Sequence, residues 1–243
     1  MISVERHGSG PEVLLVHGGA SPSTTWRGLE PLRERWQLVS AYRRGYPPSA
    51  PFLAGHMDFE VDADDLLQLL DAQPHVVAHS YGALGALLAV ARRPVSTRSL
   101  TLIEPALYLP AGDPEVARLE RMGNAVLRDG PDSDPATLME FLQIAGAPVD
   151  EDLPLSDPVV HGIERAHGGR SPSEARPDFD AIRRARVPCL VASGEHTVGI
   201  ERMCDAVAAE LGARRIRAPG AGHFVPAAPG FVDSLHEFLV SAA

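Results

Sequence analysis

The sequence contains no lysine, and all 22 of its basic residues are arginine. This absence excludes enzymes that need a lysine amine, such as those that form a Schiff base with a carbonyl substrate or with pyridoxal phosphate. It also excludes a P-loop nucleotide site, whose lysine reaches the phosphates. Any chemistry of this chain must therefore be carried by other side chains.

Cysteine is scarce as well. Cys189 stands in an apolar run that is typical of a buried strand, and Cys204 follows in a stretch with helical character. Domains that depend on disulfides are small and carry many more cysteines for their length. We therefore expect two reduced, buried thiols rather than a disulfide bond.

Positive charge is outweighed, since 22 basic residues face 32 acidic ones and give a formal net charge of −10. Nucleic acids and anionic membrane surfaces both attract basic patches, so neither is an expected partner. No apolar run reaches the roughly 18 residues of a membrane-spanning helix. Residues 1–7 also lack the pattern of a signal peptide. These observations favour a cytoplasmic protein that acts on a small molecule.

The sequence pattern predicts alternating strands and helices. Its 243 residues and 44% hydrophobic content suit one large domain. The predicted strands cover residues 2–7, 13–17, 37–42, 75–78, 99–103, 189–193 and 214–218. The predicted helices cover residues 24–35, 58–71, 199–211 and 230–240, and one more follows Ser80. Such alternation indicates an α/β fold with a mainly parallel, doubly wound sheet.

The most informative segment is residues 78–82, AHSYG, which joins the apolar run 75–78 to the small residues of 83–89. This pattern predicts a strand, a sharp turn and a helix, with Ser80 at the turn. Small neighbours are needed because the helix begins at once and packs close to the strand. The hydroxyl of Ser80 would then stand above the edge of the sheet.

A serine hydroxyl needs a base that accepts its proton during attack. His223 is the best candidate, because it lies in the glycine-rich segment GAGHF, residues 220–224, directly after a predicted strand. A histidine can accept the proton and later return it to the leaving group near neutral pH. His79, beside the serine, is expected to pack beneath the turn instead.

Taken together, the strand and His-Gly loop of residues 13–20, the AHSYG turn and the late GAGHF loop resemble the α/β-hydrolases in content and order. Ala78 stands where the first glycine of that turn usually lies. The resemblance implies that the backbone N–H groups of Gly19 and Tyr81 form an oxyanion hole, with Ala20 as the alternative to Gly19.

The third catalytic residue departs from this family. Its acid usually follows the strand 189–193 in a pattern like G-E-x-D, but residues 194–197 read GEHT and place Thr197 there. A threonine cannot stabilise an imidazolium by charge. Glu104, at the end of the strand 99–103, is the acid that we expect, because some family members place it there. Glu195, or no acid at all, are the alternatives.

Residues 107–186 interrupt the alternation, being rich in proline and acids and lacking a convincing core strand. Residues 114–128 and 135–145 are amphipathic. The resemblance implies a helical lid inserted after the sixth strand, with residues 1–106 and 187–243 as the core. A lid would cover Ser80 and form the wall of the substrate pocket, although the same apolar stripes could simply pack on the core.

The sequence thus predicts a cofactor-free serine hydrolase that cleaves a carboxylic ester, thioester or lactone through an acyl-enzyme on Ser80. No metal site is expected, because the ten histidines form no H-x-H or H-E-x-x-H pair. Two alternatives remain because of Thr197: a lyase or C–C cleaving enzyme on the same scaffold, or a ligand-binding protein with a degraded site.

Overall fold

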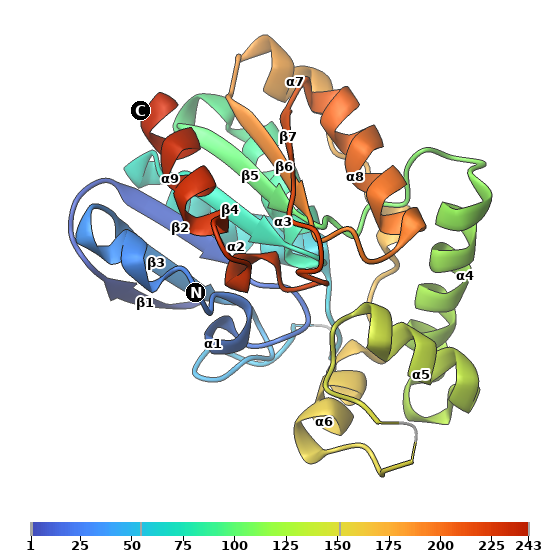
Figure 1. Ribbon diagram of the computed structural model, residues 1–243. Coiled ribbons are helices and arrows are strands. Elements are labelled where there is room, and N and C mark those ends of the chain that lie inside the picture. The colour runs from blue at the N-terminus through green and yellow to red at the C-terminus, as the bar shows by residue number, and fades with distance from the viewer. Residues whose placement is uncertain (1, 54, 151, 243) are drawn as a thin grey trace.

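The computed structural model describes residues 2–53, 55–150 and 152–242. They contain a seven-stranded sheet in the order β1-β3-β2-β4-β5-β6-β7 (Figure 1). The strands are β1 (Ser3–His7), β2 (Glu12–Val16), β3 (Gln37–Tyr42), β4 (His75–His79), β5 (Ser99–Ile103), β6 (Cys189–Ser193) and β7 (Arg214–Arg217). β1 pairs antiparallel with β3 at one edge, and the remaining pairings are parallel. The mainly parallel α/β fold is confirmed.

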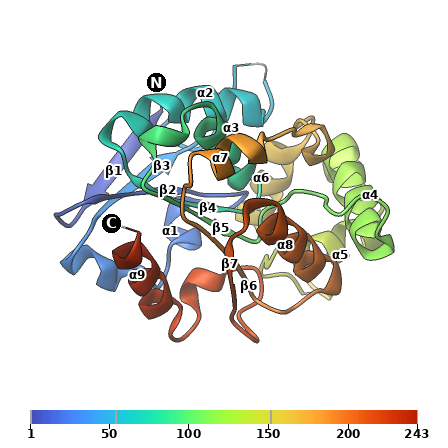
Figure 2. The same cartoon turned by 90° about the horizontal axis from the view of Figure 1, so that it is seen from above.

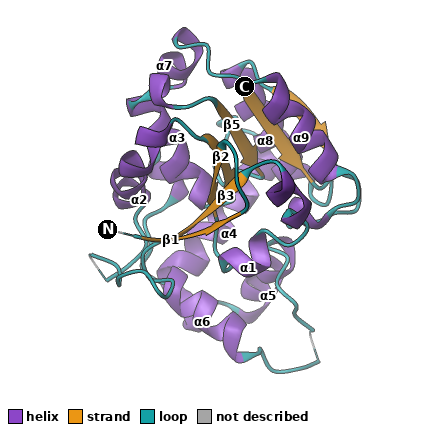
Figure 3. Cartoon of the chain, turned by 90° about the vertical axis from the view of Figure 1, so that its left-hand side faces the viewer, coloured by secondary structure: helices purple, strands orange, loops and turns teal. Residues whose placement is uncertain are grey.

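Helices cover both faces of this sheet (Figure 2 and Figure 3). They are α1 (Pro22–Thr25), α2 (Phe59–Leu67), α3 (Gly82–Arg92), α4 (Pro114–Asp129), α5 (Pro135–Ile144), α6 (Asp157–Ala166), α7 (Phe179–Arg184), α8 (Val198–Leu211) and α9 (Phe231–Ser241). Alternate residues of a strand point to opposite faces. Leu14 and Val16 therefore pack with α2, α3 and α8, whereas Val13 and Leu15 pack with α9.

The inserted segment, residues 107–186, lies between β5 and β6 and contains α4 to α7. It follows the fifth strand rather than the sixth that was predicted, because the described residues before it form only β1 to β5. Helices α4, α5 and α6 stand to one side of the sheet (Figure 1). The last helix, α7, instead packs against α3 and α8 on the sheet, so the segment is not uniform.

The predicted helix over residues 24–35 is wrong in its extent. α1 ends at Thr25, and a separate 3-10 helix covers Glu30–Glu34. The break lies at Gly28, whose φ of +98° is unfavourable for other residues. A Cβ there would lie 2.4 Å from the carbonyl oxygen of Pro226, so the close approach to the loop before α9 requires glycine.

The cysteines and the helix lengths agree with the sequence. Cys189 and Cys204 are both buried and free, as expected. Across the described parts of the chain, we find no helix with the length and apolar character needed to cross a bilayer.

Candidate active site

Ser80 occupies a tight turn between β4 and α3. Its φ is +52°, the left-handed region that a non-glycine residue rarely adopts. Its backbone N–H donates to the carbonyl oxygen of Ile103 at 3.0 Å, which ties the turn to the end of β5. At Gly82 a Cβ would lie 2.1 Å from the carbonyl oxygen of His17, so the helix can start there only because the residue is glycine. The strand–turn–helix geometry predicted from AHSYG is present.

Ser80 lines a cavity of about 500 Å³ together with His223 and Glu104. Most of the remaining wall is apolar and comes from the inserted segment. These apolar residues are Leu119, Met122, Val126 and Leu127 of α4, Phe141, Leu142 and Ile144 of α5, and Val159 and Ile163 of α6. The cavity therefore places one polar cluster at the end of a largely apolar space, as ligand sites commonly do.

The carboxylate of Glu104 contacts the predicted base. Its Oε2 accepts a hydrogen bond from Nδ1 of His223 at 2.6 Å, and its Oε1 accepts one from the backbone N–H of Gly194 at 2.8 Å. Burial by itself would raise the pKa of Glu104, but hydrogen bonds from His196 and His223 outweigh burial and lower the pKa to about 2. Glu104 is therefore ionised at neutral pH.

A second histidine, which the sequence analysis missed, shares this carboxylate. Nε2 of His196 lies 2.9 Å from the same Oε2 of Glu104. Nδ1 of His196 is 3.2 Å from the hydroxyl of Thr197. Burial alone would lower the pKa of His196, but the hydrogen bond to Glu104 and its negative charge raise it. The only available signal was that GEHT follows the strand that pairs with β5.

Glu195, the alternative acid, lies elsewhere. It is exposed, and its Oε1 is 3.6 Å from Nε of Arg217. Its backbone N–H donates to Glu201 at 3.1 Å. The hydroxyl of Thr197 lies 3.2 Å from Nδ1 of His196, and no hydrogen bond joins it to His223 among the described residues. Of the two carboxylates considered from the sequence, Glu104 is the one that the fold brings to His223.

The predicted oxyanion residues, Gly19 and Tyr81, both line the cavity, as does Ala20. The Gly19 carbonyl oxygen accepts a hydrogen bond from the hydroxyl of Tyr46 at 2.8 Å, which holds the loop. Tyr81 is the residue directly before α3, so its N–H lies at the positive end of that helix. Its side chain has a structural partner, because the hydroxyl donates to the carbonyl oxygen of Arg170 at 2.9 Å.

His79 lies beneath this cluster. Its Nε2 donates to the carbonyl oxygen of His223 at 2.8 Å, and the centroids of the His79 and His223 rings are 4.5 Å apart. Burial lowers the pKa of His79 to about 3, so the ring is neutral and can carry its proton on Nε2. His79 therefore fixes the backbone of the His223 loop, in line with the packing role expected for it.

In the described parts of the chain, Glu104, His196 and His223 form a group of side chains that could offer ligands to a metal, with one atom from each within 4.8 Å of the others. Hydrogen bonds of 2.6 and 2.9 Å already join them. Ligands of a tetrahedral zinc ion lie roughly 3.4 Å apart, given metal–ligand distances near 2.1 Å. An ion would have to break both hydrogen bonds, so these contacts explain the cluster without one.

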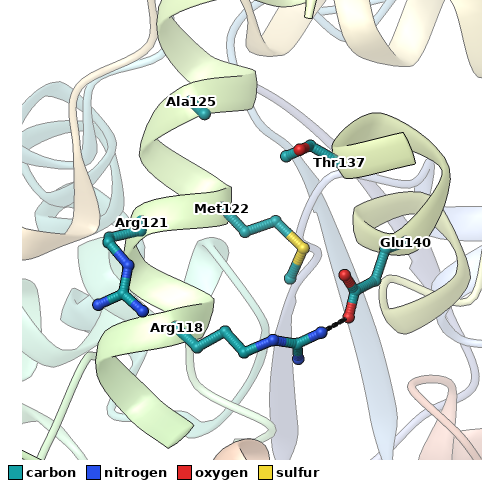
Figure 4. A pocket seen from close by; sticks show the side chains of 6 residues that line it. All are labelled: Arg118, Arg121, Met122, Ala125, Thr137 and Glu140. Carbon is teal, nitrogen blue, oxygen red and sulfur yellow. Dashed lines mark hydrogen bonds and ion pairs between the residues drawn. The ribbon is translucent and has the colours of Figure 1, made fainter. Parts of the chain in front are cut away.

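A smaller hollow of about 290 Å³ lies between α4 and α5 (Figure 4). Arg118 and Glu140 face each other across it and form an ion pair, and Met122 lies between the two helices. The lining contains neither Ser80 nor a histidine. This hollow is therefore separate from the cluster of Ser80, Glu104 and His223.

Comparison with known proteins agrees with the geometry. Residues 13–234 match the model of the Alpha/beta hydrolase family. The chain is 31% identical over 176 residues to a pimeloyl-[acyl-carrier protein] methyl ester esterase of Methylococcus capsulatus, a match that covers 70% of this chain and 65% of that protein. A protein of the same name from Aeromonas hydrophila is 31% identical over 117 residues, 46% of this chain and 44% of that protein.

Among solved structures, a thermophilic esterase from Thermogutta terrifontis has a TM-score of 0.70 at 22% identity, covering 99% of this chain and 93% of that one. This likeness concerns the fold. The chain thus matches about two thirds or less of the length of the two curated relatives, but nearly the whole length of this structure.

Proposed function

Because the chain belongs to the α/β hydrolase family, we propose that it is a serine hydrolase that cleaves carboxylic esters through an acyl-enzyme on Ser80. The observation that carries the proposal is the cluster in the larger cavity. There a strained serine, a histidine and a buried carboxylate that holds this histidine line one space. The match to two methyl ester esterases supports an ester as the substrate rather than a lactone or thioester.

In the proposed mechanism, the Ser80 hydroxyl attacks the ester carbonyl carbon while His223 accepts its proton. Glu104 occupies Nδ1 of His223, which leaves Nε2 as the atom that exchanges the proton. Glu104 also stabilises the imidazolium by its charge. The oxyanion accepts hydrogen bonds from the N–H groups of Gly19 and Tyr81. The alcohol leaves with the proton of His223, and water then hydrolyses the acyl-enzyme by the same route.

We assign the inserted segment the role of a lid. Residues 1–106 and 187–243 supply Ser80, His223 and Glu104, whereas residues 107–186 supply most of the apolar wall. Covering the ester with apolar side chains excludes water, which strengthens the electrostatic interactions that catalysis uses. Because α7 packs on the sheet, the covering part is α4 to α6.

Intact-mass measurement after treatment with a fluorophosphonate tests the proposal. Wild type should gain one adduct, Ser80→Ala none, and Ser21→Ala one, because Ser21 lines the same cavity without contacting a base. Circular dichroism establishes that each variant is folded. A folded wild type that forms no adduct would contradict acyl-enzyme chemistry and favour a non-acylating enzyme or a ligand-binding protein.

A further inference from the structure

Arg165 lies in the last turn of α6 and lines the cavity that holds Ser80. It is the only arginine among the described residues of this lining. The other fully charged member, Glu104, is already engaged by two histidines and the N–H of Gly194. The cavity thus offers a substrate one cationic group in a mostly apolar wall.

The guanidinium of Arg165 has no ion-pair partner among the described residues. Its Nε is buried and makes no hydrogen bond, and no carboxylate in the described parts of the chain forms an ion pair with it. Three other arginines of the inserted segment form ion pairs, namely Arg118 with Glu140, Arg128 with Asp129 and Arg170 with Glu174. A buried N–H without an acceptor is costly, and Arg165 is the arginine whose Nε is in this state among the described residues.

Arg165 is nevertheless held in position. Its Cζ lies 4.9 Å from the ring centroid of Tyr46, a cation–π contact. The hydroxyl of the same Tyr46 donates to the carbonyl oxygen of Gly19. One tyrosine therefore supports both the proposed oxyanion loop and the guanidinium. Stacking leaves the planar edge of the guanidinium free for hydrogen bonding.

We propose, on the basis of the ester-cleaving function above, that Arg165 binds a carboxylate carried by the substrate, so that the preferred substrate is an ester with a second, free carboxylate. A guanidinium matches a carboxylate by two parallel hydrogen bonds, and the two terminal Nη groups of Arg165 can supply them. A phosphate monoester fits less well, because its second negative charge would remain unbalanced in a cavity with one cation.

The test uses pairs of methyl esters of equal chain length. Monomethyl esters of linear dicarboxylic acids with four to eight carbons are compared with methyl esters of the corresponding monocarboxylic acids. For the best chain length, wild type should favour the carboxylated ester by about 10- to 100-fold in kcat/KM, the range of a hydrogen bond to a charged group. 4-Acetoxybutyrate and its methyl ester show whether the carboxylate lies on the alcohol side instead.

Arg165→Gln should remove this preference, mainly by raising KM for the carboxylated ester. Arg165→Lys keeps the positive charge but lacks the planar pair of donors, so it should retain part of the preference for the carboxylated ester. Arg128→Gln, which removes an exposed arginine of α4, is the matched control and should behave like wild type.

Wild type that cleaves neutral and carboxylated esters equally on both the acyl and the alcohol side would overturn the proposal. So would a preference that survives in Arg165→Gln. Failure of the ester-cleaving function itself is distinguishable, because then neither ester is cleaved and Ser80 takes up no fluorophosphonate. A marked preference for a phosphorylated ester that Arg165→Gln abolishes would replace the carboxylate by a phosphate.

Discussion

The ends of β5 and β6 carry the same residue type in the same backbone conformation but in opposite environments. Glu104 follows β5 with a φ of +44°, and Glu195 follows β6 with a φ of +52°. Glu104 is buried between two histidines, whereas Glu195 is exposed and faces Arg217. The end of a strand therefore fixes only where the carboxylate lies. The partners that other segments bring there decide what the carboxylate can do.

The largest expected effect separates these two residues directly. Glu104→Gln should lower kcat for ester hydrolysis by about 10³- to 10⁴-fold, as loss of the acid does in a serine protease triad. Glu195→Gln should change kcat less than about threefold, because Glu195 only faces exposed groups. Steady-state kinetics on one neutral ester measures both. Equal losses in the two variants would show that Glu104 is not the acid.

A substitution at Gly194 can shift His223 relative to the Glu104 carboxylate while both side chains are kept. Its N–H donates to Glu104, and a Cβ on Gly194 would lie 2.0 Å from the carbonyl oxygen of Gly222, the residue before His223. Gly194→Ala must therefore shift the loop of His223. A displacement of about 1 Å can cost about 10²-fold in rate, so we expect kcat to fall by that order.

Thermal melting of Gly194→Ala tells a local shift from a failure to fold. A cooperative transition together with slow fluorophosphonate labelling of Ser80 is the expected result. Labelling at the wild-type rate would mean that the position of His223 does not depend on this contact.

His196 is the second histidine that contacts Glu104, and Glu195 at the end of β6 has no such partner in the described residues. His196→Ala removes one of three hydrogen bonds to Glu104 and should lower kcat by about tenfold, which corresponds to about 1.4 kcal/mol. His196→Gln, whose amide can still donate, should recover part of this loss. Full activity of His196→Ala would assign all of the positioning to Gly194 and His223.

The pH dependence gives a readout specific to His196. Glu104 raises the pKa of this histidine, so His196 stabilises the fold fully below pH 6.5. That contribution is lost as the pH rises through its folded-state pKa. A protonated His196 also competes with His223 for the carboxylate, so the wild-type rate should rise over the same interval. Denaturant titration and kcat against pH should both lack this step in His196→Gln.

The sequence predicts those parts of the site that lie in local motifs of consecutive residues. Ser80 and His223 stand in glycine-rich or small-residue turns next to apolar runs, and local sterics fix such turns. Glu104 is predictable because it ends a strand. His196 is not, because its hydrogen bond joins positions 92 residues apart and depends on which strands become neighbours. The need for glycine at position 28 is equally hard to predict, because it comes from a close approach to Pro226, which is far away in the sequence.

The smallest expected effect comes from restoring the acid to the end of β6. Thr197 is the residue before α8, where aspartate caps a helix well, so Thr197→Asp should fold normally. Its side chain contacts His196 rather than His223, and an aspartate there would face the same ring. In a Glu104→Gln background, we therefore expect Thr197→Asp to regain less than about threefold of the lost kcat. A recovery of tenfold or more would show that the loop before α8 can turn its carboxylate to His223. The difference between the two strand ends would then lie in residue choice rather than in backbone geometry.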